Sequence, residues 1–109
     1  MIRYQDFAKI DIRIGTIIQV RGFPQAIKPA WQLKIDFGEI GIKSSSAQLT
    51  DLYSPDDLLG KQVMAVVNFP VKQIANFFSE CLVLGFPNKE GQVILAGADK
   101  QVPNGARLF

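Results

Sequence analysis

The side chains that could do chemistry in this 109-residue chain form an incomplete set. There is no histidine, so the commonest general base and the commonest metal ligand are both missing. The single cysteine, Cys81, has no histidine to activate it, and its neighbours in ECLVLG alternate like a strand, so we expect a small buried side chain there. No paired carboxylates, nucleophile–base pair or phosphate-cradling glycine loop is visible. The sequence therefore predicts a protein that is not an enzyme and uses no metal or cofactor.

The polar side chains suited to binding gather in three stretches. One lysine lies in the alternating run WQLKIDFG (31–38), and another precedes three serines in IKSSSA (42–47), where hydroxyls and a cation could contact phosphate oxygens. The third stretch, NFPVKQIANFFSE (68–80), is interpreted as a loop that combines amides, one cation and aromatic rings. The candidate RNA-binding residues in these stretches are Lys34, Lys43, Ser44, Ser45, Asn68, Lys72, Gln73, Ser79 and Glu80.

Each stretch also has an ordinary structural explanation. Lys34 is compatible with a solvated strand residue, and the serines could satisfy backbone groups where a strand ends. Glu80 is an unexpected choice beside phosphates, unless it accepts hydrogen bonds from base edges, from a lysine or from backbone amides. Because adjacent residues of an extended chain point in opposite directions, we expect one of Phe77 and Phe78 to anchor the segment and the other to be partly exposed.

The charge and hydropathy of the chain indicate little about which partner it binds. The net charge is +2, and the basic excess lies in residues 1–50, which carry seven Lys/Arg against four Asp/Glu. This mild bias is far from the dense basic face of a strong nucleic-acid binder. The length indicates a single domain covering residues 1–109. We expect no membrane insertion and a reducing, cytoplasmic location, since no long apolar segment and no disulfide partner are present.

Alternating apolar residues predict extended strands along most of the chain. The clearest case places Trp31, Leu33, Ile35 and Phe37 on the inward face of one strand. In the first strand the even-numbered residues share one apolar face, Ile17 is an exception on the other face, and Gly15 suggests a bulge or a sharp bend. The expected strands are 12–20, 31–37, one that begins near Ile40, 62–69, 81–86 and 92–96, with hairpin connections at Gly38–Glu39 and 87–91.

Two helical segments are expected. The clearer one is SPDDLLG (54–60), in which Ser54 caps the helix and Pro55 occupies its first position. A single turn at 6–11, capped by Asp6, precedes the first strand. Five or six short strands with one helix between the third and fourth predict an all-β, five-stranded Greek-key barrel of the OB type. Such a barrel binds ligands across one sheet face and the neighbouring loops.

Five longer stretches occur together and in order over nearly the whole chain: FAKIDIRIGTI, IDFGEIGIKSSSAQLTDLY, VVNFP, SECLVLG and VPNGARLF. In this combination the chain resembles the CsaA-type tRNA-binding-domain proteins, bacterial relatives of the module appended to methionyl- and other aminoacyl-tRNA synthetases. The resemblance implies an OB fold, a homodimer, and binding of tRNA by shape and backbone without catalysis. The alternative that it implies is chaperone-like, export-related binding of unfolded polypeptide or the secretion machinery, through apolar surface near Phe77, Phe78 and the dimer seam.

The resemblance also assigns regions. It places the 68–70 turn, Lys72 and the Ser79–Glu80 pair on the RNA-facing side, with Lys34 and the 43–45 corner beside it. Family members often carry a proline at Val71, a basic residue at Gln73, a glycine at Asn76 and a lysine at Phe78, so this chain is expected to make fewer phosphate contacts and to expose more apolar surface. The terminal segments correspond to those that build the dimer, through Phe7, Ile10, Val102, Pro103, Leu108 and Phe109.

Overall fold

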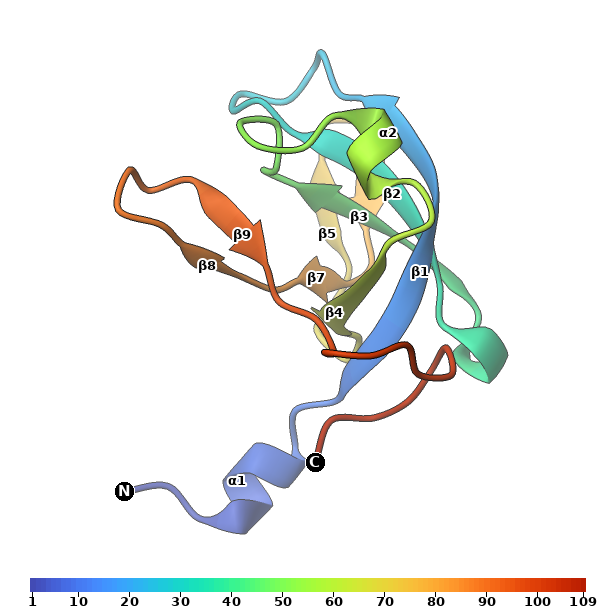
Figure 1. The fold of residues 1–109 in the computed structure, drawn as a ribbon, viewed down its shortest axis with the longest axis vertical. Helices are drawn as coiled ribbons and strands as arrows, with labels where there is room; N and C mark the ends of the chain where they lie inside the picture. Colours follow the sequence, from blue (N-terminus) through green and yellow to red (C-terminus); the bar gives the residue numbers. More distant parts are fainter.

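A curved five-stranded antiparallel sheet forms the centre of the molecule in the computed structural model, which describes residues 1–109 (Figure 1). The strand order is β3-β2-β1-β4-β7, and the sheet closes almost completely into a barrel. Its strands are β1 (Ile12–Gly22), β2 (Trp31–Asp36), β3 (Ile42–Ala47), β4 (Gln62–Val66) and β7 (Leu82–Val83). A helix, α2 (Pro55–Leu58), lies between the third and fourth strands. The predicted five-stranded barrel with this helix position is confirmed.

Two small hairpins stand beside the barrel. One is formed by β5 (Lys72–Ile74) and β6 (Phe77–Ser79), and the other by β8 (Gly85–Pro87) and β9 (Val93–Leu95). The second hairpin, which the sequence predicted, extends away from the barrel (Figure 1). The first is a correction, because 68–80 was interpreted as a loop. Its two strands have only three residues each, too few for a periodic pattern to be visible in the sequence.

The inward-facing side chains of β2 form the centre of the core and pack against the other strands. Leu33, Ile35 and Phe37 are almost completely buried, and Trp31 packs at the edge of the same cluster. Each apolar side chain faces inward because successive residues of a strand point to opposite sides of the sheet. The inward face predicted for 31–37 is confirmed. Cys81 also belongs to this core, as expected.

The inward face of β1 differs from the prediction. Gly15 and Ile17 face the core, whereas Ile18 is 43% exposed. The register with β2 shifts between Ile17 and Gln19, so one extra residue switches the strand from odd to even inward positions. The bulge therefore lies at Ile18, not at Gly15. Gly15 serves packing instead, since a Cβ there would approach a methyl carbon of the Ile35 side chain to 2.6 Å.

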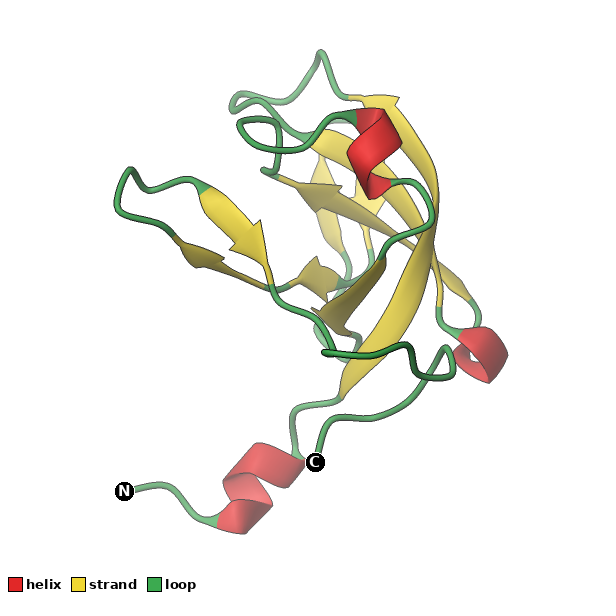
Figure 2. Ribbon diagram, viewed as in Figure 1, coloured by secondary structure: helices red, strands yellow, loops and turns green.

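Helix α2 begins as the sequence indicated, and Figure 2 shows it at one end of the barrel. The Ser54 hydroxyl accepts a hydrogen bond from the Asp57 amide at 3.3 Å, and the Asp57 carboxylate accepts one from the Ser54 amide at 2.9 Å. The bond from the Ser54 amide, with the Ser54 hydroxyl beside it, lowers the pKa of Asp57, because it stabilises the charged carboxylate. Gly60, with φ of +85°, ends the turn, and Leu58 is buried against the barrel.

Two other local predictions need correction. Helix α1 spans Tyr4–Ala8, with Arg3 at the N-cap, and Asp6 accepts the Arg3 amide from the third helical position instead of capping the helix. The connection between β2 and β3 is longer than a two-residue hairpin, because it contains a 3₁₀ turn, η1 (Gly38–Ile40). Glycines at both ends of this turn have positive φ values, which permit the tight path.

Candidate nucleic-acid interface

The register of β1, β2 and β3 brings polar side chains into two rows on the outer face of the barrel. Gln19 pairs with Lys34, which pairs with Ser44. Directly paired residues of an antiparallel sheet lie on the same face, so these side chains are neighbours. The adjacent row pairs Arg21 with Gln32 and Gln32 with Ser46. We call these two rows the polar strip; its members are Gln19, Arg21, Gln32, Lys34, Ser44 and Ser46.

The same register divides the residues expected at the 43–45 corner. Lys43 pairs with Ile35 and Ser45 with Leu33, so both lie on the face that forms the core. Ser45 is fully buried, and its hydroxyl donates to the carbonyl oxygen of Cys81 at 2.9 Å. It therefore has no access to a phosphate and serves the packing of the barrel. Lys43 is half-buried on that side, away from Lys34.

Residues 79–81 close the barrel against β3. The Glu80 amide donates to the carbonyl oxygen of Ser44 at 2.8 Å, and the Ser44 amide donates to Glu80 Oε1 at 2.9 Å. One step along, the Ser46 amide donates to the Ser79 hydroxyl oxygen at 3.1 Å. The Ser79 hydroxyl is thus occupied by the fold. Glu80 is the carboxylate that accepts a backbone amide, one of the roles considered for it from the sequence.

The side-chain amide of Asn68, two residues after the end of β4, is already hydrogen-bonded within the protein. Its Oδ1 accepts the Asp11 amide at 3.0 Å, and its Nδ2 donates to the Lys9 carbonyl oxygen at 2.8 Å. Both ends of the amide therefore hold the N-terminal segment in place. Although the residue is exposed, its polar atoms already have partners, and we assign it a structural position rather than a free contact.

The β5–β6 hairpin divides its side chains between two faces. Lys72 pairs with Ser79, while Gln73 pairs with Phe78 on the opposite face. Phe77 packs against Phe23 with ring centroids 5.4 Å apart, whereas Phe78 is 55% exposed. One aromatic anchors the hairpin and the other faces solvent, as the sequence indicated. Gln73 is also exposed, although its Nε2 donates to a carbonyl oxygen in the hairpin turn.

The polar strip carries two cations, Arg21 and Lys34, that form no ion pair. The three ion pairs of the structure all involve the N-terminal segment or its contact with the C-terminal segment. Arg21, Lys34 and Lys72 are exposed and belong to none of them. Lys72 pairs with Ser79, whose hydroxyl oxygen accepts the Ser46 amide, so it lies near one end of the strip. Charge that no carboxylate neutralises remains available to an anionic ligand.

Sequence reasoning missed four members of the strip, namely Gln19, Arg21, Gln32 and Ser46. Arg21 is the most consequential, since it adds a cation diagonal to Lys34 on the same face. The signal that could have found it is the pairing of the first two strands. That pairing depends on the bulge at Ile18, which sequence alternation placed elsewhere.

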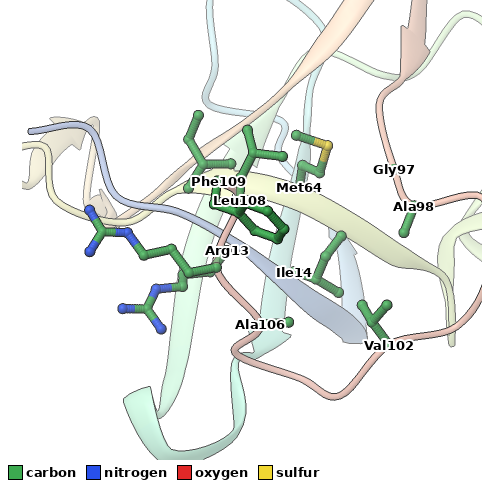
Figure 3. Close-up of a pocket in the computed structure, with 11 residues that line it drawn as sticks. Arg13, Ile14, Met64, Gly97, Ala98, Val102, Ala106, Leu108 and Phe109 are labelled. Carbon is green, nitrogen blue, oxygen red and sulfur yellow. The ribbon is translucent and has the colours of Figure 1, made fainter. Parts of the chain in front are cut away.

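The terminal segments lie together at the opposite end of the molecule from α2 (Figure 1). An apolar groove of about 280 Å³ runs between β1, β4 and the C-terminal segment. Figure 3 shows Ile14, Met64, Val102, Leu108 and Phe109 around it, while Arg13 extends away. A second hollow beside α1 is lined by four of the residues predicted for the dimer seam, Phe7, Ile10, Leu108 and Phe109. Pro103 is exposed but lines neither hollow.

The chemistry of the remaining groups gives no catalytic arrangement. Burial raises the pKa of the Cys81 thiol to about 11, so the thiolate needed of a nucleophile is disfavoured. No group of three or more Cys, Asp or Glu side chains is arranged to hold a metal ion. No helix is both long and apolar enough to cross a membrane.

Comparisons with known proteins agree with this picture. Residues 12–107 match the family described as "Putative tRNA binding domain". The chain is similar to two solved structures over its whole length: chaperone CsaA from Bacillus anthracis (48% identity, TM-score 0.94, 99% of that chain covered) and CsaA chaperone protein from Picrophilus torridus (55%, 0.93, 100%). It is also 34% identical over 108 residues to a methionine–tRNA ligase of Flavobacterium johnsoniae.

The ligase comparison has a limited extent. The matched segment is 99% of this chain but only 15% of the ligase, so the chain spans about a seventh of such relatives and shares with them a binding domain, not a catalytic one. The CsaA similarity, by contrast, covers both chains almost completely. On the match over residues 12–107, the chain belongs to the tRNA-binding-domain family, which is non-catalytic and OB-fold-like.

Proposed function

We propose that this chain is a non-catalytic, homodimeric tRNA-binding protein of CsaA type, which recognises tRNA by its backbone and shape through the polar strip and Lys72. The observation that carries the proposal is the strand register, which places the exposed cations Arg21 and Lys34 among amides and hydroxyls on the outer face of an OB-type barrel in a member of the tRNA-binding-domain family. Hydroxyls and amides flank these cations.

The composition of the strip favours contacts to phosphate and ribose. Its members are cations, amides and hydroxyls, which bind phosphate oxygens and 2′-hydroxyl groups, and none is aromatic. Such contacts fix the position and orientation of a nucleic acid without reading its sequence. Three cations per chain give modest affinity, which decreases steeply as salt concentration rises.

Two copies acting together would raise this affinity. We propose that they associate through the groove and the hollow at the terminal segments, where Leu108 and Phe109 are exposed. Linked sites gain affinity because the second contact becomes intramolecular. Light scattering at micromolar concentration should give the mass of a dimer, and Phe109→Ser should lower it towards that of a monomer. A monomeric wild-type chain would exclude this arrangement.

The decisive experiment for RNA binding is fluorescence anisotropy with labelled tRNA. The double variant Arg21→Glu, Lys34→Glu reverses both strip cations and should weaken binding more than tenfold at low salt. The matched control, Lys89→Glu with Lys100→Glu, changes the net charge equally at exposed positions outside the strip and should change affinity far less. Equal effects of the two double variants would assign binding to net charge alone.

A second candidate function is favoured by exposed apolar side chains around the β4–β5 connection. Phe69, Val71, Phe78 and Leu82 are each about half exposed, and such a patch is typical of a protein-binding surface. The candidate is chaperone-like binding of unfolded polypeptide, consistent with the similarity to CsaA chaperone proteins. Suppression of client aggregation that persists at high salt and is lost in Phe78→Ser would support it. Suppression that salt abolishes would point to charge instead.

A further inference from the structure

A separate hollow of about 300 Å³ lies between the β4–β5 connection and residues 79–82. Phe69, Pro70 and Leu82 supply an apolar wall, and Phe69 is 54% exposed. Lys72 and Glu80 add a cation and a carboxylate. The volume is at the lower limit of small-ligand sites, which suits a group of about the size of one nucleoside.

Few polar atoms in this hollow are free to bind a ligand. The Ser79 hydroxyl already accepts the Ser46 amide. Glu80 Oε1 accepts the Ser44 amide at 2.9 Å, which fixes the orientation of the carboxylate, and Oε2 has no hydrogen-bond partner within the protein. Lys72 forms no ion pair. The hollow therefore offers one held acceptor and one cation beside an aromatic ring.

A fixed carboxylate is a poor neighbour for a phosphate, because like charges at close range repel. It is a good acceptor for the amino group of a nucleobase, the contact that Glu and Asp make to cytosine N4. Unpaired bases in RNA loops and ends stack on aromatic side chains while their edges are hydrogen-bonded. The free Oε2 and the exposed Phe69 match these two requirements, and Lys72 lies close enough to contact the adjoining phosphate.

We propose that this hollow holds one unpaired RNA base that carries an exocyclic amine. The base stacks on Phe69, its amine donates to Glu80 Oε2, and Lys72 contacts the adjoining phosphate. This inference rests on the proposed tRNA-binding function and adds to it a preference at one position. Uracil fits worse, because its imino N–H lies between two carbonyl oxygens that the carboxylate repels.

Cytosine and uracil provide a matched test, since they have nearly the same shape but opposite groups at position 4. Decamers of cytidylate and uridylate compete with labelled tRNA for the wild-type chain, and we expect the cytidylate decamer to compete about five- to tenfold better. In Glu80→Gln the amide oxygen still accepts the Ser44 amide, while the new NH₂ group faces the hollow as a donor. The preference should then fall to unity or reverse towards uridylate.

The control is Glu90→Gln, which removes the same charge from an exposed turn between β8 and β9 and should leave the cytidylate preference unchanged. The ratio of the two decamers is the readout, because a general gain in affinity from the lost charge affects both equally. Equal competition by both decamers, competition by neither, or an unchanged ratio in Glu80→Gln overturns the base site while tRNA binding stands. Absence of tRNA binding to the wild-type chain overturns the proposed function itself.

Discussion

The polar strip makes a quantitative prediction for Lys34. This lysine is exposed, has no ion-pair partner, and lies between Gln19 and Ser44 in the register of β1, β2 and β3. If it contacts one phosphate, then Lys34→Ala should remove about one released counterion from the binding equilibrium. The backbone should be undisturbed, because the side chain faces solvent.

The size of the effect follows from the number of free cations. Arg21, Lys34 and Lys72, at about 0.9 each on a duplex region, give a slope of about −2.7 per chain in a plot of log affinity against log salt. Raising salt from 50 to 200 mM should then weaken binding about 40-fold for each chain that contacts the tRNA. Lys34→Ala should reduce the magnitude of the slope to about 1.8 per chain and the salt-induced loss to about 12-fold per chain.

Anisotropy titrations of labelled tRNA at five salt concentrations would measure both slopes. Lys89→Ala is the matched control, since Lys89 is exposed in the turn of the β8–β9 hairpin, which extends away from the barrel (Figure 1). Its slope should equal that of the wild type. A slope for Lys34→Ala that does not differ from the wild type would remove the polar strip from the binding surface.

Three further predictions concern the fold that supports this surface. Gly15→Ala should lower the free energy of unfolding by about 1–3 kcal/mol in urea denaturation, because the new methyl group meets buried side chains, whereas Gly22→Ala, with no atom within 4 Å, should be nearly neutral. Ser54→Ala should cost about 1 kcal/mol through loss of the helix cap, and an unchanged midpoint would contradict the cap. The Cys81 thiol should react with a thiol reagent at pH 8 only after unfolding. Since burial raises its pKa to about 11 from an ordinary value of 9.0, its contribution to stability should be lost between these pH values as pH rises.

Most of the fold could be predicted from the sequence, because long runs of alternating apolar residues mark most of its strands. The inward face of β2 and the cap of α2 follow from local patterns that their surroundings reinforce. The bulge at Ile18 was not accessible, since alternation along β1 favours the even positions, which hold three of its four isoleucines. Only packing against β2, where Gly15 meets Ile35 and Phe37, selects the odd positions.

The candidate site was predicted less completely, for a related reason. Alternation along 31–38 placed Lys34 on the outer face, but for Lys72 and the residues of 43–45 residue type did not say which face of a strand each occupies. Lys43 and Ser45 illustrate this, because they neighbour Ser44 in sequence yet lie on the opposite side of β3. Arg21 joins Lys34 only through the pairing of β1 with β2, which no local pattern encodes.

The side chains that close the barrel also shape the candidate RNA surface. Between β3 and residues 79–81, Ser79 and Glu80 side chains accept backbone amides that a regular ladder would pair with carbonyl groups. This exchange leaves the second carboxylate oxygen of Glu80 without a protein partner, beside the hollow lined by Lys72. Closure by a carboxylate thus stabilises the barrel and presents an acceptor in the same step. This role in closing the barrel accounts for a negative charge at a surface otherwise suited to anions. Glu80→Gln keeps the hydrogen bond to the Ser44 amide, so it tests base binding without disturbing the fold, whereas truncation of the side chain would remove that bond as well.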